Sequence, residues 1–244
     1  MLYLIGLGLN GDLTREGLAA AKACTVYLEV YTSFLTKSVK DLERIVGNPI
    51  TTLTREDIEE TQKVLEEAKT GNVALLVAGD PLVATTHAEI VIEARKLNIK
   101  TKIIHNSSIY SAVAETGLQI YKFGKTITIP YPQKGFQPTS FYDTLEKNRI
   151  MGAHTLVLLD VQHDQNKYMN PREAMEILHR LGFRNDVVCI SRLGSDDQKI
   201  IYGNITDLLP VSNEMWDSPP HCLVVPSKLH FKEEEYLQFY KVIP

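Results

Sequence analysis

The sequence predicts an α/β protein of two similar-sized domains with mostly parallel or mixed sheets. Short apolar runs alternate with amphipathic helical stretches along the whole chain, and this alternation is typical of strands connected by helices. With 244 residues, 44% of them hydrophobic and 23% charged, the chain has the size of two compact globular domains. The Pro- and Gly-punctuated stretch from Pro130 to Pro138 suits neither a helix nor a central strand. We therefore expect domains at residues 1–124 and 125–244.

Helix-start residues help to place the elements of the first domain. Thr54 and Asp57 form a variant of the capping box ahead of a helix expected at residues 55–69. Further helices are expected at 85–97, with Thr85 and Thr86 as candidate N-caps, and at 108–116, and the expected strands are 2–6, 25–30, 50–53, 73–78 and 101–105.

The second domain contains a near-ideal helix start. Asn170 can cap the helix, Pro171 suits its first position, and Glu173 completes a capping box three residues after the cap. The expected helices are residues 140–151, 171–181 and 232–240, and the expected strands are 155–160, 187–191, 199–202 and 221–226.

Composition disfavours several classes of function. A net charge of −4 and scattered Lys and Arg give no basic stripe, so nucleic acid is not an expected partner. Cys24, Cys189 and Cys222 are far apart and odd in number, so neither a disulfide framework nor a metal cluster is expected. The H-x-E pattern at His87 lacks a following P-C-x-x-C, which leaves zinc chemistry unsupported.

Hydrophobic run lengths predict a cytoplasmic protein without a membrane span. No apolar run approaches the length needed to cross a bilayer, and the N-terminal apolar stretch lacks a basic segment and a small-residue cleavage site. The charge run Glu233–Glu235 is expected to be solvated at the start of the last helix, where acids suit the helix dipole.

Two glycine turns follow expected strands. Gly6–Gly11 has the G-x-G-x-x-G spacing of dinucleotide-binding folds, and a second turn begins at Gly79-Asp80-Pro81. Ligands of open α/β sheets bind beyond the carboxyl ends of the strands, so both turns are expected to face one crevice. The alternative is that each is only a tight turn between a strand and a helix.

The first turn suits a sulfonium cofactor better than NAD. Glu29 lies where the ribose-binding acid of an NAD site would be, which favours NAD. However, Gly11–Thr14 resembles a loop and a cap rather than the start of a helix, and Asp12 would repel a pyrophosphate. S-adenosylmethionine has no phosphate and is positively charged, so an acidic, glycine-lined crevice suits it.

Several segments resemble the diphthine synthase family, of the tetrapyrrole-methylase-like class of methyltransferases. The resemblance covers nearly the whole chain. It rests on residues 4–9, 79–87, 108–112, 116–124, 138–140, 155–160, 219–221 and 228–230.

This resemblance implies two α/β domains with S-adenosylmethionine bound in the cleft between them and S-adenosylhomocysteine as product. It further implies methylation of the amino group of a 3-amino-3-carboxypropyl chain on a histidine of translation elongation factor 2, and a homodimer. The stretch Arg192–Ile200 is more similar to the eukaryotic branch, which implies methylation of the carboxylate to the methyl ester as well.

The resemblance also implies which residues contact the cofactor. Asp80 can accept hydrogen bonds from polar or cationic groups, with a turn acceptor as the alternative role, and Ser108 can serve the carboxylate or the ribose. For Leu9, Val83 and Leu159 a plain core role is the alternative. The implied cofactor-binding residues are Leu9, Asp80, Val83, Ser108, Ile109, Leu159, Leu193 and His221.

Methyl transfer to an amine needs positioning and a proton acceptor but no metal. Asp160, His87 and Tyr31 are candidates for that acceptor, each with a structural role as the alternative, and the sequence does not identify the catalytic base. Two other functions stay open: methylation of a tetrapyrrole or another small molecule, and a non-catalytic, cofactor-binding regulatory protein.

Overall fold

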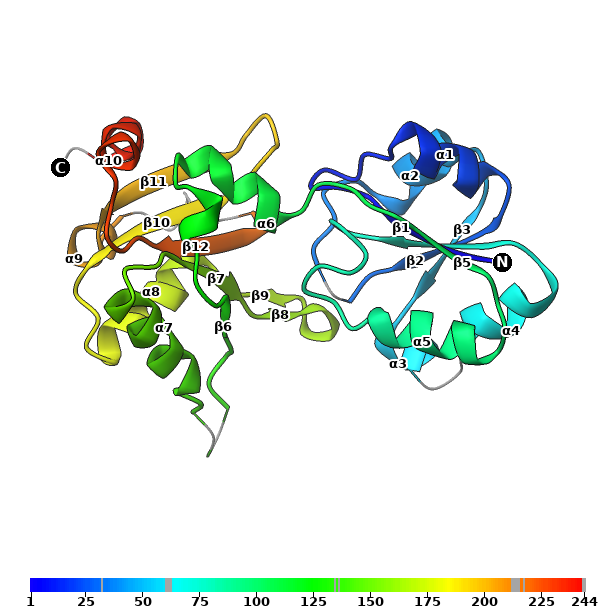
Figure 1. The fold of residues 1–244 in the computed structure, drawn as a ribbon, viewed down its shortest axis with the longest axis horizontal. Helices are drawn as coiled ribbons and strands as arrows, with labels where there is room; N and C mark the ends of the chain where they lie inside the picture. The colour runs from blue at the N-terminus through cyan, green and yellow to red at the C-terminus, as the bar shows by residue number, and fades with distance from the viewer. Residues whose placement is uncertain are drawn as a thin grey trace. The chain divides into compact units, whose positions relative to one another are not determined.

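The computed structural model of the chain describes residues 1–31, 33–59, 63–133, 135, 137–211, 216 and 218–242. The chain forms two compact units, Met1–Tyr110 (unit 1) and Ser111–Pro244 (unit 2), each built around its own sheet (Figure 1). Both units combine helices and strands, which confirms the predicted α/β class.

Unit 1 contains a five-stranded parallel sheet in the order β3-β2-β4-β1-β5. Helices α1 and α2 lie on one face of the sheet, and α3, α4 and α5 lie on the other (Figure 1). The strands are β1 (Leu2–Gly6), β2 (Thr25–Glu29), β3 (Ile50–Leu53), β4 (Val73–Val77) and β5 (Thr101–Ile104), and the helices are α1 (Arg15–Lys22), α2 (Val39–Val46), α3 (Arg55–Glu59), α4 (Lys63–Thr70) and α5 (Ala88–Lys96).

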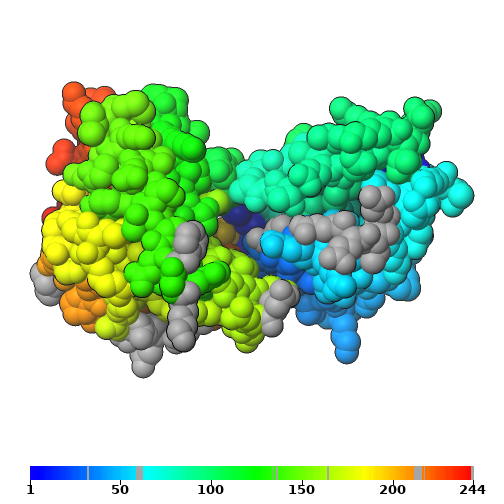
Figure 2. Space-filling view, turned by 90° about the horizontal axis from the view of Figure 1, so that it is seen from below, coloured from blue at the N-terminus to red at the C-terminus, as the bar shows by residue number. Residues whose placement is uncertain are grey.

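Strand β1 shows why this sheet needs helices on both faces. Leu2 and Leu4 belong to a buried cluster with Val64 of α4 and Ile90 of α5, whereas Ile5 belongs to a cluster with residues of α1 and α2. Side chains alternate between the faces of a strand, so a sheet covered on both sides requires runs that are apolar throughout. Figure 2 shows α4 and α5, coloured cyan to green, covering one side of the unit.

Two helix predictions in unit 1 need correction. The helix expected at 55–69 is present as α3 and α4, and residues 60–62 lie outside the described residues. Thr85 and Thr86 do not cap the next helix, since α5 begins at Ala88 with His87 in the N-cap position. The hydroxyl of Thr85 instead donates to the Pro81 carbonyl at 2.6 Å, so the preceding turn uses the side chain expected to cap the helix.

Unit 2 contains a five-stranded mixed sheet in the order β11-β10-β12-β7-β6, in which the β6–β7 pair is parallel and the other pairs are antiparallel. A hairpin of β8 and β9 lies outside it. The strands are β6 (Ile127–Ile129), β7 (Thr155–Leu159), β8 (Val161–Gln162), β9 (Lys167–Tyr168), β10 (Asp186–Ser191), β11 (Lys199–Asn204) and β12 (His221–Val225). The α-helices are α6 (Ile109–Ala112), which crosses the boundary between the units, α7 (Ser140–Ile150), α8 (Pro171–Arg180), α9 (Ile205–Leu208) and α10 (Phe231–Leu237), and the short 3-10 helices are Val113–Thr116, Ile120–Lys122, His163–Gln165 and Gln238–Tyr240.

The core of unit 2 lies between its sheet and helices α7 and α8. Leu145 of α7 and Met175 of α8 are buried in one cluster with Val157 and Leu223 of neighbouring strands. The predicted capping box of α8 is confirmed, because the Asn170 side chain accepts from the backbone of Glu173 while the Glu173 side chain accepts from the backbone of Asn170.

The segment before the Pro-rich stretch folds with unit 2. Phe123 forms a bridge with His154, and the Gly124 N–H donates to the His154 carbonyl at 2.8 Å. Residues 111–124 therefore lie in the second compact unit, although the composition places the domain boundary after Gly124.

Glu233 is buried at the start of α10, so the solvated position expected for it was wrong. Its carboxylate accepts from Gln119 N at 2.9 Å and from His230 N at 2.7 Å. It also bonds to Lys122 Nζ and to His154 Nε2, the latter at 3.1 Å. Most of these partners are far away in the sequence, which hides the burial of the acid from a local pattern.

Candidate functional site

The two glycine turns of unit 1 meet at the carboxyl ends of β1 and β4. Gly8 N donates to Gly79 O at 3.1 Å, and Gly79 N donates to Gly8 O at 2.9 Å. Both residues have positive φ, +61° and +70°, which favours glycine. A Cβ at Gly6 would lie only 2.6 Å from Gly79 O. The glycines thus allow a close approach of backbone to backbone at the sheet edge where ligands of open α/β sheets bind.

The topology shows that the G-x-G-x-x-G spacing is not a dinucleotide fingerprint. Strand β1 lies between β4 and β5. In dinucleotide-binding folds the strand order is 3-2-1-4-5-6, so the first strand lies between the second and the fourth. Gly11 lies in a turn, and α1 begins at Arg15 after Thr14, whose side chain accepts from Gly17 N at 3.0 Å. The side chain of Glu29, the candidate ribose-binding acid, is buried beside His87.

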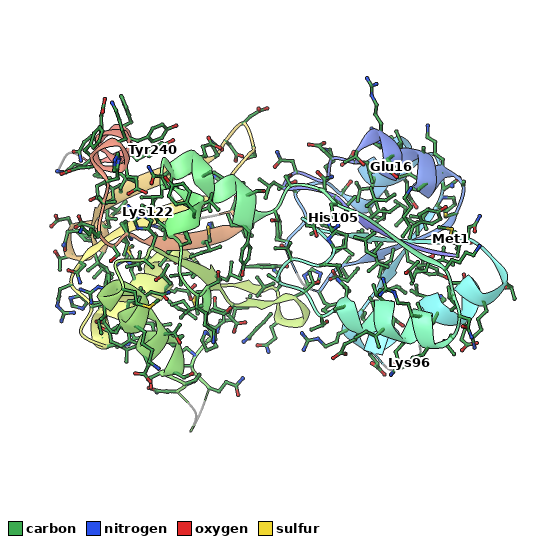
Figure 3. The ribbon with its side chains drawn as sticks, viewed as in Figure 1. Met1, Glu16, Lys96, His105, Lys122 and Tyr240 are labelled. Carbon is green, nitrogen blue, oxygen red and sulfur yellow. The ribbon has the colours of Figure 1, made fainter. Side chains whose placement is uncertain are left out.

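Asp80 is a buried residue of the second glycine turn. Its Oδ1 accepts from Leu82 N at 3.1 Å, which confirms the turn-acceptor role that the sequence left open. Its Oδ2 lies 2.8 Å from His105 Nδ1 and accepts from Asn106 N at 3.2 Å; His105 follows β5 (Figure 3). Since a carboxylate has about four lone-pair sites, Asp80 keeps capacity for one more donor.

Asn106 is a site residue that the sequence analysis missed. Its Nδ2 donates to Gly6 O at 2.9 Å and to Asp12 O at 2.7 Å, while its Oδ1 accepts from Ser107 N at 2.8 Å. The side chain thereby ties the first glycine turn to the loop after β5. Its position directly after an apolar strand could have marked it as a candidate, because strand-end loops hold ligands in such sheets.

Unit 1 brings together five of the residues expected to bind the cofactor. They lie after three neighbouring strands, β1, β4 and β5, at one edge of the sheet, four of them in loops and Ile109 at the start of α6. Asp80 and Ser108 are buried, and the others are half-buried. The five residues are Leu9 after β1, Asp80 and Val83 after β4, and Ser108 and Ile109 after β5.

Unit 2 brings the other three expected residues to one edge of its own sheet. His221 begins β12 and pairs with Ser191, the last residue of β10, and Leu193 follows two residues later. On the other side of β12, Cys222 pairs with Leu158, so Leu159 ends β7 beside the start of β12.

His221 is held neutral within unit 2. Its Nδ1 lies 2.7 Å from the hydroxyl of Ser191. Burial, and to a smaller extent the charge of Arg192, lower the pKa of His221 to about 4, against a hydrogen bond with the backbone of Trp216 that raises it. A neutral imidazole does not repel a cationic ligand.

Arg192 fixes the backbone between Ser191, which pairs with His221, and Leu193. It adopts a positive φ of +49°, a strained conformation for a residue with a side chain. Its NH1 donates to Ser218 O at 2.7 Å, and its Nε lies 2.7 Å from Asp197 Oδ2. These contacts hold the turn after β10 in place.

The comparisons with known proteins agree with one another. The family model of the Tetrapyrrole (Corrin/Porphyrin) Methylases matches residues 1–209. Diphthine synthases of Methanococcus maripaludis strain S2 and Methanocaldococcus jannaschii are each 42% identical to the chain and cover 98% of it, over 98% of their own lengths. The chain belongs to the tetrapyrrole methylase family, among the diphthine synthases. The resemblance of its motifs to this family is thereby confirmed.

Solved structures of diphthine synthases have the same fold. A crystal structure named as a candidate diphthine synthase from Entamoeba histolytica has a TM-score of 0.90 and 37% identity, and covers 100% of this chain and 99% of its own. A second diphthine synthase structure has a TM-score of 0.90 and 35% identity, over 98% of this chain and 95% of its own. Membership of this family makes the protein a methyltransferase.

The three candidate proton acceptors differ in their surroundings. His87 is fully buried, and Tyr31, which is almost buried, meets the His87 ring edge-on. Asp160 is half-buried directly after Leu159, where its carboxylate accepts from Tyr131 N at 2.9 Å. Of the three, Asp160 therefore combines solvent access with a place beside an expected cofactor-binding residue.

Neither a metal cluster nor a membrane span is found in the part of the chain that the structure describes. Within it, no three His, Cys, Asp or Glu side chains are grouped so as to hold a metal ion. None of the helices in the same residue ranges combines the length and the apolar character needed to cross a bilayer.

Proposed function

We propose that this methylase uses S-adenosylmethionine to methylate the amino group of the 3-amino-3-carboxypropyl histidine on translation elongation factor 2. The observation that supports this most strongly is 42% identity to diphthine synthases over 98% of the chain. We include methylation of the carboxylate as a second step, on the similarity of Arg192–Ile200 to the eukaryotic branch.

The proposed cofactor contacts in unit 1 are Leu9, Asp80, Val83, Ser108 and Ile109. A Cβ on Gly79 would meet no atom nearer than 3.9 Å, so this glycine leaves room for an adenosine close to the sheet edge. The buried carboxylate of Asp80 suits the positive charge of the cofactor, and Ser108, whose Cβ would lie 4.0 Å from a Cβ placed on the neighbouring Gly79, offers a hydroxyl. The residues present therefore fit the cofactor.

The proposed contacts in unit 2 are Leu159, Leu193 and His221. The aliphatic side chains of Leu159 and Leu193 suit an adenine ring. The neutral imidazole of His221 adds a polar contact without opposing the cofactor's positive charge. When bound, the cofactor supplies the methyl group.

The protein's contribution to the reaction is mainly positioning. Holding two reactants in attack geometry can lower a barrier by roughly 7–11 kcal/mol. The substrate amine must also lose a proton before each methylation. We assign the acceptance of that proton to Asp160, which Tyr131 N and Gln162 Nε2 orient through hydrogen bonds of 2.9 and 3.0 Å.

We further propose a cytoplasmic homodimer. The family resemblance supports this proposal, and two aromatic residues of unit 2, a type enriched at protein interfaces, are highly exposed: Tyr121 by 83% and Phe239 by 82%. Light scattering should give the mass of a dimer, and Phe239→Glu should lower that mass if Phe239 lies in the contact between the two copies.

The decisive experiment incubates the purified protein with methyl-labelled S-adenosylmethionine and elongation factor 2 that bears the unmethylated 3-amino-3-carboxypropyl histidine. Label should appear on that histidine, and a base-labile fraction should report the ester. Label on a tetrapyrrole but not on elongation factor 2 would assign the protein to small-molecule methylation. Cofactor binding without any transfer would favour a regulatory binder instead.

A further inference from the structure

A buried histidine lies behind the second glycine turn, and the proposed chemistry does not use it. His87 is fully buried at the start of α5, but its side chain does not cap that helix. Its Nδ1 lies 3.2 Å from the carbonyl oxygen of Pro81. A carbonyl can only accept, so Nδ1 carries the hydrogen of this bond. The ring therefore holds the Asp80–Pro81 turn from its inner side.

Glu29 lies on the opposite side of the same ring. This residue ends β2, its side chain is fully buried, and its Oε1 accepts from Tyr31 N at 2.6 Å. Its Oε2 lies 3.6 Å from His87 Nε2, and the Tyr31 ring contacts the imidazole edge-on at a centroid distance of 6.4 Å. Burial lowers the pKa of His87 below its ordinary value, and the Glu29 charge and the hydrogen bond to the Pro81 backbone oppose this shift.

The turn that His87 holds is strained. Ala84 has a φ of +56°, a left-handed conformation that is unfavourable for a residue with a side chain and must be held by its surroundings. The Pro81 carbonyl also accepts from the hydroxyl of Thr85 at 2.6 Å, and Val83 N donates to Asp80 O at 3.2 Å. Contacts to Pro81 thus determine where Asp80 and Val83 lie.

We propose that His87 is a positioning residue, which fixes the Pro81 carbonyl and so places Asp80 and Val83 for cofactor binding without touching the cofactor. This inference rests on the proposed function, because it assumes that the Asp80 turn binds S-adenosylmethionine. It concerns affinity for the cofactor and not the chemical step.

The test compares His87→Ala, His87→Asn and Glu29→Gln with the wild type by calorimetry with S-adenosylhomocysteine and by steady-state kinetics. His87→Ala should raise both the dissociation constant of S-adenosylhomocysteine and the KM for S-adenosylmethionine about tenfold, and change kcat by less than about threefold. His87→Asn should restore most of the affinity, because its amide can donate to Pro81 O. Glu29→Gln should also stay near the wild type, since Gln keeps an acceptor for Tyr31 N.

His154→Ala is the matched control. His154 is equally buried and lies beside a carboxylate, Glu233, but belongs to unit 2 and is distant in sequence from the turn. The His154→Ala variant should have a lower melting temperature than the wild type and an unchanged KM for S-adenosylmethionine. A structural effect of losing any buried histidine would instead raise the KM in both alanine variants.

Two outcomes would overturn the inference while leaving the proposed function intact. The first is a folded His87→Ala variant that binds S-adenosylhomocysteine as the wild type does. The second is a nitrogen NMR spectrum of the native protein that shows no proton on Nδ1 of His87, because His87 could then not donate to the Pro81 carbonyl. This measurement tests the inference even if the His87→Ala variant does not fold. Failure of the wild type itself to bind S-adenosylhomocysteine would overturn the proposed function instead.

Discussion

Gly8 and Gly79 face each other at the ends of β1 and β4, and each donates its backbone N–H to the carbonyl of the other. This reciprocal pair joins two turns that are far apart in the sequence. Side chains of Asn106 and Ser107 stand against Gly8, whereas a Cβ on Gly79 would meet no atom nearer than 3.9 Å.

We expect the close approach at this edge to make Gly6→Ala strongly destabilising. Its new Cβ would lie 2.6 Å from Gly79 O, and backbone cannot move aside as a flexible side chain can. The loss should exceed about 2 kcal/mol in the free energy of unfolding measured in urea. Gly47→Ala is the control: that residue has a φ of +80° and no atom within 4 Å of its new Cβ, so it should lose only about 1 kcal/mol from backbone strain. Equal losses would contradict the role of the clash.

Asp80→Ala should weaken S-adenosylhomocysteine binding by about 1–3 kcal/mol in calorimetry, because a buried hydrogen-bond acceptor is removed. Glu93→Ala removes an exposed carboxylate paired with Lys96 on α5 and should leave the affinity unchanged. Unchanged affinity in Asp80→Ala would limit Asp80 to its bonds with Leu82, His105 and Asn106.

Asp160→Asn should lower kcat for methylation about 100-fold and leave the KM for the cofactor nearly unchanged, since an amide cannot accept the proton of the amine. Asp143→Asn, an exposed position on α7, is the control and should behave as the wild type. If Asp160→Asn retains full kcat, solvent or another residue accepts the proton.

Glu233 should make the stability of the protein sensitive to acid. Burial acts to raise its pKa, but hydrogen bonds from His230, Lys122, Gln119 and His154 outweigh it and lower the pKa to about 2 from 4.5. A carboxyl with a depressed pKa stabilises the fold above its unfolded pKa, and this stabilisation is lost as the pH falls from about 4.5 towards 2. We expect Glu233→Gln to lose about 3 kcal/mol at pH 7 in urea unfolding, a difference that should shrink through that window. If the difference in free energy of unfolding between Glu233→Gln and the wild type stays constant down to pH 2, the Glu233 carboxylate is not the source of the acid sensitivity.

The sequence revealed elements whose stabilisation is local. Strand β4 is recognisable in the sequence because all five of its residues are apolar, and α8 because Asn170, Pro171 and Glu173 have the pattern of a capped helix start. Elements that are fixed by distant contacts could not be recognised from the sequence. Strand β6 has three residues, too few for a pattern, and its pairing with β7 is a tertiary contact. The antiparallel pairing in unit 2 likewise has no local signature.

In the candidate site, too, local features could be predicted from the sequence and features that depend on distant contacts could not. Strand ends and glycine turns pointed to the loops after β1 and β4, which the structure joins through Gly8 and Gly79. Asn106 escaped notice because its role depends on Gly6 and Asp12, about a hundred residues earlier. The buried position of His87 is equally a product of tertiary packing, since only the folded sheet places it beside Glu29.

The inner position of β1 sets the order in which unit 1 can assemble. The ribosome delivers β1 before its two neighbours, because β1 pairs with β4 at Val73–Val77 and with β5 at Thr101–Ile104. Until those segments emerge, the apolar run of β1 has no strand on either side, and such late, non-local pairing slows folding. The nascent chain therefore exposes an unpaired β-segment while most of unit 1 is synthesised, a period in which a chaperone could bind it.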